Sequence, residues 1–194
     1  MTLESAVVLL ILVMDPFGNI PFFLTALNQV ESSRHLRVVI RELLIALAVM
    51  IVFLFVGRPL ISVLGISEPA LTIAGGVILF LIALRMVFPS PGRAFNEDLE
   101  GEPFIVPLAI PYVAGPSVLA AELLLMSREP ERWPTWLLAV AIAWAVTATV
   151  VTLGSRVRRW LGVRGLIAIE RLMGMILVAI AIQMFLSGVG TFFG

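Results

Sequence analysis

Two short stretches of the chain place a carboxylate, an amide, a hydroxyl, glycines and prolines inside long apolar runs. The first is Asp15-Pro16-Phe17-Gly18-Asn19, and the second is Gly115-Pro116-Ser117-Val118. Aspartate and glycine are both acceptable at a helix N-cap, and proline is favoured at the first helical position. Each stretch therefore predicts the start of a new half-helix in the middle of a longer one.

Such a start leaves backbone N–H groups that would bind an anion. The predicted free groups are those of Phe17, Gly18, Ser117 and Val118. A helix N-terminus carries a partial positive charge, and its unpaired N–H groups suit a carboxylate. The two breaks are therefore candidate binding positions for an anionic group.

Asp15 and Asn19 offer the complementary chemistry. Their side chains could hold a substrate ammonium group, a cation or a proton, so one site could bind both ends of a zwitterion. An ionisable residue at this depth in an apolar segment is a functional-site hypothesis by default. The alternative is that Asp15 only caps its own half-helix and never touches a substrate.

The composition predicts a membrane protein. Of 194 residues, 60% are hydrophobic and 13% are charged, with a mean hydropathy of +1.09. A soluble domain has about 45–50% apolar and about 25% charged residues. The absence of cysteine excludes disulfides, thiol nucleophiles and cysteine-ligated metals. We also expect no metal site and no cofactor, apart from a possible coupling ion. The net charge of zero gives no indication of a nucleic-acid partner.

Six apolar segments are long enough to cross a bilayer, which takes about 20 residues. They lie near residues 3–27, 38–56, 69–88, 104–126, 136–153 and 166–187. The two breaks fall within the first and the fourth segments. Because a bilayer offers no water to an interrupted backbone, such a break persists only where it lines a cavity or is buried in protein. We expect an all-α polytopic protein of six transmembrane helices with broken first and fourth helices.

The two halves of the chain match each other at a nearly constant offset. Residues 76–86 and 174–184 are identical at six of eleven positions, and the triplets centred on Gly65 and Gly162 also match. The two breaks match at a similar offset. Three such matches in the same order indicate an internal repeat.

The expected organisation is a first three-helix repeat over residues 1–88, a linker over residues 89–103 and a second repeat over residues 104–194. Three crossings are an odd number, so the second repeat enters the membrane from the opposite side. Inverted repeats of this kind are common in secondary transporters, whose substrate sites lie where the repeats meet.

The arginines predict the orientation. The first, third and fifth connections hold nine of the thirteen arginines, and the second and fourth hold three. Basic residues favour the cytoplasmic side. The linker over residues 89–103 is therefore expected to be cytoplasmic, with both termini outside.

Three glycines and two acidic residues complete the candidate positions. Gly75, Gly76 and Gly174 would let the third and sixth helices pack closely near the site. Glu122 is expected near the outer end of the fourth segment and Glu170 about one turn inside the sixth. Snorkelling of the side chains to the membrane interface explains both acidic residues.

Four motifs resemble the MarC family of integral membrane proteins. They are Met14 to Pro21, Ile73-Ala74-Gly75-Gly76, Pro107 to Pro111 with Ala114-Gly115-Pro116, and Arg171-Leu172-Met173-Gly174. The resemblance covers essentially the whole chain. It implies a six-helix inverted-repeat protein of the cell inner membrane, with sites at the two broken helices. It also implies a small neutral amino acid (glycine, alanine, serine or threonine) as the substrate.

Three functions remain open from the sequence. The first is a secondary transporter of small neutral amino acids that works by alternating access, with H⁺ or Na⁺ as a possible coupling ion. The second is a membrane scaffold or regulator that transports nothing. The third is an intramembrane enzyme, but the sequence shows no second carboxylate at the level of Asp15 that an acid–base pair would need. The transporter is favoured, and the oligomeric state stays open.

Overall fold

The computed structural model describes residues 1–27, 30–88 and 108–193. All regular structure in these ranges is helical, which confirms the all-α prediction for the described part of the chain. The elements are α1 (Leu3–Met14), α2 (Pro16–Leu27), η1 (Ser32–Arg34), α3 (His35–Val63), α4 (Glu68–Val87), η2 (Leu108–Val113), α5 (Pro116–Arg128), η3 (Pro130–Arg132), α6 (Trp133–Thr152) and α7 (Gly154–Phe193).

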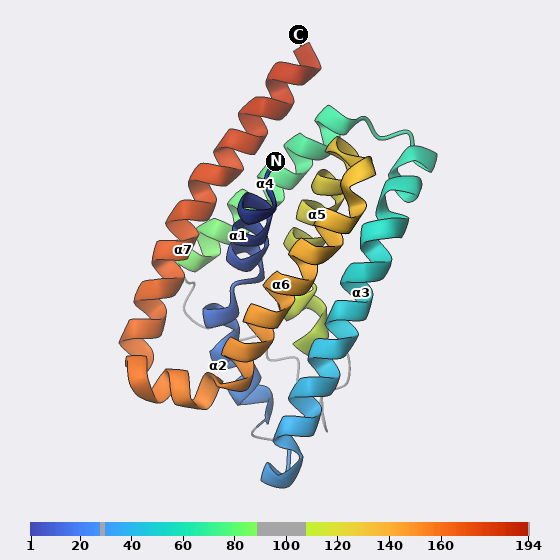
Figure 1. Cartoon of the computed structure of the whole chain (residues 1–194). Helices are drawn as coiled ribbons and strands as arrows, with labels where there is room; N and C mark the ends of the chain where they lie inside the picture. The colour runs from blue at the N-terminus through green and yellow to red at the C-terminus, as the bar shows by residue number, and fades with distance from the viewer. Residues whose placement is uncertain (28–29, 89–107, 194) are drawn as a thin grey trace.

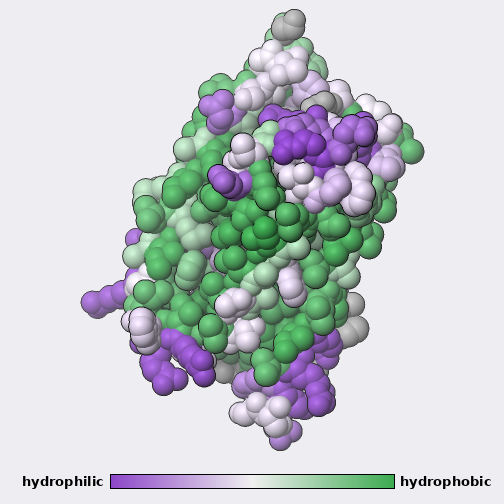
Figure 2. Space-filling view, in the orientation of Figure 1, coloured by the Kyte–Doolittle hydropathy of each residue, from purple (hydrophilic) through white to green (hydrophobic). Residues whose placement is uncertain are grey.

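The long helices run side by side as one bundle, and both termini lie toward the same end of it (Figure 1). Within the described residues, four stretches are long and apolar enough to cross a membrane: Leu3–Leu27, Ser32–Leu60, Pro130–Thr152 and Gly154–Phe193. Figure 2 shows the matching surface, with hydrophobic side chains across the middle of the visible face and hydrophilic ones at both ends. This distribution is that of a protein embedded in a bilayer.

The other two predicted segments are also helical in their described parts. Helix α4 corresponds to the third segment, and η2 followed by α5 corresponds to the fourth, whose residues 104–107 lie outside the described ranges, as does the predicted linker over 89–103. Helix α5 has 13 residues. At 1.5 Å per residue it is about 20 Å long, shorter than a hydrocarbon core of about 30 Å.

Helix α5 lies at the centre of the packing. Its residues Val118, Ala121 and Glu122 to Leu125 are buried. It packs against α1, α3 and α4 from the first half of the chain and against α6 from the second. A helix that is enclosed on all sides in this way has no face left for lipid.

Helices α4 and α7 share the most extensive helix contact in the described structure, and two glycines permit their approach. A Cβ on Gly76 would lie 2.9 Å from the Ala181 carbonyl oxygen, and one on Gly174 would lie 2.8 Å from Met86 Cβ and 3.1 Å from the Ala83 carbonyl oxygen. Any side chain at either position would force the helices apart. Small residues at helix contacts in membranes play this role generally.

Gly65 and Gly162 turn the chain at the ends of helical stretches. They have left-handed φ angles of 67° and 66°, the only glycines in the described residues with positive φ. No other group would crowd a Cβ at either position, so the backbone conformation itself requires glycine. At Gly162 the segment labelled α7 changes direction, from a short stretch across one end of the bundle to the long final helix (Figure 1).

Candidate functional site

The first break consists of one residue, Asp15, between α1 and α2. Its backbone is left-handed (φ 44°, ψ 64°), and its N–H ends α1 by donating to the Ile11 carbonyl oxygen at 3.1 Å. Its Oδ1 accepts a hydrogen bond from the Gly18 N–H at 3.0 Å and so caps the start of α2. Aspartate is one of the few residues other than glycine that adopts this backbone conformation readily.

The Asp15 carboxylate occupies the space that a side chain at Gly18 would need. A Cβ at Gly18 would lie 2.0 Å from Asp15 Oδ2, so only glycine allows the carboxylate to fold over this turn. The Gly18 N–H, expected to be free for an anion, is therefore occupied. This corrects the expectation for Gly18, because a capping carboxylate already satisfies that donor. The second oxygen, Oδ2, has no hydrogen-bond partner within the described residues and remains available.

Asn19 ties the first break to the second half of the chain. Its Nδ2 donates to the Met14 carbonyl oxygen at 2.8 Å and to the Tyr112 carbonyl oxygen at 2.9 Å. Both amide hydrogens are used, and the side chain is buried. The nitrogen therefore holds backbone in place, which leaves the amide oxygen as the group that could contact a ligand. Pro16 is buried and Phe17 is half-buried beside it.

The second break begins with η2, a short π-helical turn. Ile110 within it is extended (φ −127°, ψ 126°), and the Ala114 N–H bonds to the Ala109 carbonyl oxygen at 2.9 Å. Gly115 then takes the N-cap position of α5 without a side chain to cap it, and Pro116 opens the helix.

The N-terminus of α5 is buried and lacks a protein cap. The N–H groups of Ser117 and Val118 have no hydrogen-bond partner in the described part of the chain. The two residues are only 8% and 1% exposed. A helix start that is buried with unpaired N–H groups normally has a ligand, water or a side chain at that position. The two breaks thus differ: α2 is capped by its own Asp15, and α5 is open.

The two breaks meet through Tyr112, the only tyrosine of the chain. Besides accepting from Asn19, Tyr112 stacks on Phe22 of α2, with ring centroids 4.6 Å apart and an interplanar angle of 17°. Tyr112 lies three residues before Gly115. The structure therefore brings the first break next to the turn that leads into the second.

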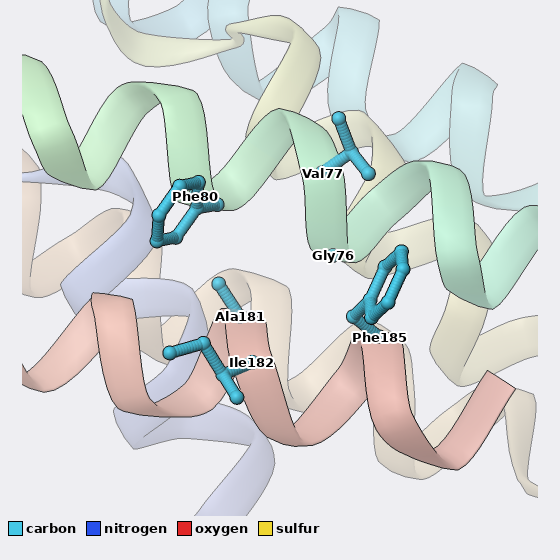
Figure 3. Close-up of a pocket in the computed structure, with 6 residues that line it drawn as sticks. All are labelled: Gly76, Val77, Phe80, Ala181, Ile182 and Phe185. Carbon is cyan, nitrogen blue, oxygen red and sulfur yellow. The ribbon is translucent and has the colours of Figure 1, made fainter. Parts of the chain in front are cut away.

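The predicted packing glycines lie elsewhere, at the α4–α7 contact. Gly76 lines a recess of about 230 Å³ with Val77, Phe80, Ala181, Ile182 and Phe185, which Figure 3 shows between the two helices. Its lining has no polar atoms, and Val77, Ile182 and Phe185 are 41–47% exposed at the surface. An apolar recess open to the outside does not suit a zwitterion. Gly75 faces Met184, and Gly174 faces α4.

Residues 2–193 match the sequence model of a family described as MarC family integral membrane protein. The chain belongs to the MarC family. It is 48% identical over 186 residues to the UPF0056 inner membrane protein YhgN of Escherichia coli (strain K12), covering 95% of this chain and 94% of the relative. It is 45% identical over 189 residues to a UPF0056 membrane protein of Buchnera aphidicola subsp. Schizaphis graminum, covering 97% and 96%.

A more distant MarC relative is a UPF0056 membrane protein of Chlamydia muridarum, 31% identical over 183 residues, which covers 92% of this chain and 88% of the relative. No solved structure matches the chain. The family resemblance inferred from the motifs is confirmed. The names of the relatives place them in membranes, and that of the Escherichia coli protein in the inner membrane. These names state no substrate.

Sequence reasoning missed two features of this MarC protein. Glu122, expected to reach the membrane interface, is fully buried (0% exposed), so the interpretation as a snorkelling residue is wrong. The uninterrupted apolar run around it was the signal, since a helix that is apolar on every side is buried. Glu170 of α7 is half-buried and lies close enough to Asp15 for the two carboxyl groups to interact electrostatically, which no sequence pattern indicated.

Proposed function

We propose that this MarC-family protein is a secondary transporter of small neutral amino acids, with glycine, alanine, serine and threonine as its substrates. The proposal rests on one observation above all: two interrupted helices meet through Asn19 and Tyr112, and one of them starts with unpaired, buried N–H groups. Discontinuous helices whose N-termini point at anionic substrate groups are typical of transporter substrate sites.

The two breaks would divide the zwitterion between them. The substrate carboxylate would take the N–H groups of Ser117 and Val118 at the start of α5, where the helix dipole favours negative charge. The ammonium group would take the free Oδ2 of Asp15 and the amide oxygen of Asn19. Asp15 then has two roles, because Oδ1 caps α2 while Oδ2 receives the substrate.

The proposed architecture is six crossings in two inverted repeats, in the inner membrane, with both termini outside and residues 89–103 in the cytoplasm. Two pairs of matched positions support it. Gly65 and Gly162 share the same left-handed backbone. Gly76 lies against the Ala181 carbonyl of α7, and Gly174 lies against the Ala83 carbonyl of α4. Because Gly76 corresponds to Gly174 and Ala83 to Ala181 in the two repeats, each contact is the counterpart of the other. Alternating access would move one repeat against the other around the breaks.

The test is uptake of radiolabelled glycine and alanine into proteoliposomes, with proton and sodium gradients imposed separately. The variant is Asp15→Asn, and the matched control is Glu4→Gln, which removes an exposed carboxylate from α1, the helix that ends just before Asp15. We expect saturable uptake by the wild type and by the control, and a loss of about tenfold or more in Asp15→Asn, equivalent to about 1.4 kcal/mol.

Full uptake by Asp15→Asn would keep the transporter and reduce Asp15 to a helix cap. No wild-type uptake of glycine or alanine under any gradient, followed by none of labelled serine or threonine, would reject the proposed substrate class. A wider substrate screen would then follow, and a protein that transports none of the screened compounds would favour the scaffold or regulator function.

A further inference from the structure

Glu122 of α5 is an acidic residue buried without a partner. It is 0% exposed, and neither of its carboxyl oxygens accepts or donates a hydrogen bond within the described residues. An ionised carboxylate that is buried and unpaired is strongly disfavoured, so such a group is kept for a reason other than stability. In membrane proteins ionisable residues of this kind mark ion pathways and proton relays.

The position of Glu122 links the two halves of the molecule. It lies on the helix that packs against α1, α3 and α4 from one half and α6 from the other. It follows Pro116 by six residues, which is about 9 Å along the helix axis. The next residue, Leu123, packs against α3, where a Cβ at Gly57 would lie 3.1 Å from Leu123 Cδ1. A movement of α5 between the halves would therefore change the surroundings of Glu122 directly.

The described residues on the elements packed against α5 provide no ion pair for Glu122. Helix α6 carries no titratable residue. The titratable side chains that the structure describes on the other neighbours are Glu4 on α1, His35, Arg37, Arg41, Glu42 and Arg58 on α3, Arg85 on α4, and Glu131 and Arg132 on η3. None of them forms an ion pair or a hydrogen bond with Glu122 in the described structure.

The surroundings favour a proton over a metal cation as the ligand. A metal cation needs several oxygen ligands, whereas a proton needs one. The described residues contain no group of three or more acidic, histidine or cysteine side chains that could hold a metal ion. A single carboxyl group enclosed by apolar side chains can bind one proton and become neutral.

We propose that Glu122 is the proton-binding residue that couples transport to the proton gradient. In the conformation described here the carboxyl group carries a proton. When α5 moves and water reaches the group, its O–H bond breaks, the proton passes to water and the carboxylate remains. The opposite step restores the neutral form from the other side of the membrane. The coupling role rests on the proposed transport function, but the proton site itself can be tested without a substrate.

The first experiment is infrared difference spectroscopy of the purified protein during a pH titration. A protonated carboxyl group has a C=O stretching band that a carboxylate lacks. We expect a band in the wild type that disappears reversibly as the pH rises, is absent from Glu122→Gln and persists in Glu4→Gln. A wild-type spectrum without a band assignable to Glu122, or a band that stays constant at every pH where the protein is folded, would overturn the proposal.

The second experiment separates coupling from transport in proteoliposomes. Glutamine has the shape of the protonated glutamic acid, so Glu122→Gln should still exchange labelled glycine for unlabelled glycine. Proton-driven accumulation should fall by about tenfold, within the usual range of coupling between two sites. Equal proton-driven accumulation in wild type and Glu122→Gln would overturn the coupling role. If the wild type moves no amino acid, the proposed function fails, and the infrared titration alone decides whether Glu122 binds a proton reversibly.

Discussion

Asn19 donates a hydrogen bond from Nδ2 to the carbonyl oxygen of Tyr112, 2.9 Å away and 93 positions later in the chain. The same nitrogen donates to the Met14 carbonyl oxygen, one of the acceptors left unpaired at the end of α1. One buried amide therefore donates to a backbone carbonyl at each of the two breaks. In a membrane, where no solvent can replace these hydrogen bonds, this residue makes the two interruptions compatible with one packed structure.

Replacing Asn19 should destabilise the protein and impair its function together. Asn19→Leu has a similar volume but leaves the carbonyls of Met14 and Tyr112 without their donor, at a cost of about 1–3 kcal/mol per buried unpaired group. We expect a lower thermal midpoint in detergent and reduced glycine uptake. Asn19→Asp should be at least as harmful, because an ionised carboxylate only accepts and would face two carbonyl oxygens.

The matched control for Asn19 is Gln183→Leu. Gln183 Nε2 makes a single exposed hydrogen bond of 3.3 Å to Ser187 Oγ. Its loss should change stability by no more than about 0.5 kcal/mol, as for most surface substitutions. Equal thermal midpoints for Asn19→Leu and Gln183→Leu would show that the link between the breaks adds nothing to stability.

Substitution of Gly18 should disable the cap at the first break. In Gly18→Ala the new methyl group and the Asp15 carboxylate cannot occupy their present positions together, since the Cβ would lie 2.0 Å from Oδ2. The carboxylate must leave the Gly18 N–H, and the lost cap should cost about 0.5–2 kcal/mol. Gly190→Ala is the control, because its backbone is helical and no atom beyond that local helical backbone lies within 4 Å of its Cβ position.

A double-mutant cycle identifies the cause of that loss. Asp15→Gly keeps a residue suited to the left-handed backbone and removes the clashing carboxylate. Gly18→Ala should therefore be much less harmful in the Asp15→Gly background than in the wild type, as measured by thermal unfolding. Additive effects of the two substitutions would assign the cost of Gly18→Ala to something other than Asp15.

The helix starts could be predicted from the local residue types. The features that were predicted wrongly depend on tertiary packing. The Asp-Pro and Gly-Pro pairs predict helix starts, and α2 and α5 begin at Pro16 and Pro116. The predicted second segment stopped at Val56, but α3 continues to Val63. Gly57, taken as part of a connection, instead lets α3 approach Leu123 of α5. A glycine that ends a helix and a glycine that permits close packing look the same in a single sequence.

The candidate site was predictable only in part, for a related reason. The residues of the two breaks were found from their types, but the hydrogen bond of Asn19 to Tyr112 depends on how two distant segments pack. The position of Glu122 along its segment suggested a depth near the interface. Glu122 is buried because α1, α3 and α4 pack around its helix. The position of a residue along one helix does not show which other helices lie beside it.

Acid should weaken the contact between the N-terminus and the α5–α6 turn. Hydrogen bonds from the Met1 ammonium group and from Arg132 lower the pKa of Glu129 below its usual value. Because the folded-state pKa is the lower one, this contribution to stability is present above the unfolded pKa and is lost as the pH falls through the folded pKa. Glu129→Gln should thus lower the thermal midpoint slightly at neutral pH.

The difference between the wild type and Glu129→Gln should vanish in acid and shrink in high salt, because the pair is exposed. Thermal midpoints of both proteins across a pH series at low and high salt would check this. A difference that persists at the lowest pH where both proteins fold would mean that the glutamine itself, rather than the lost charge, changes stability.

Two adjacent glycines of α4 should respond very differently to alanine. In Gly76→Ala the Cβ would lie 2.9 Å from both the Ala181 carbonyl oxygen and the Phe185 nitrogen, which are backbone atoms of α7 that cannot rotate away. Overpacking of this kind typically costs about 1–3 kcal/mol. In Gly75→Ala the only neighbour is Met184 Cε at 3.3 Å, the end of a flexible side chain.

We therefore expect a clear fall in the thermal midpoint for Gly76→Ala and little change for Gly75→Ala, measured in one detergent. A slight rise in the thermal midpoint of Gly75→Ala would also agree with this, since alanine is favoured over glycine inside a helix by about 1 kcal/mol. Gly174→Ala, with its Cβ 2.8 Å from Met86 Cβ on α4, should resemble Gly76→Ala because it crowds the same helix pair from the other side. Equal midpoints for Gly75→Ala and Gly76→Ala would show that α4 and α7 separate without cost, and would remove the close contact between them as a constraint on how the two halves move.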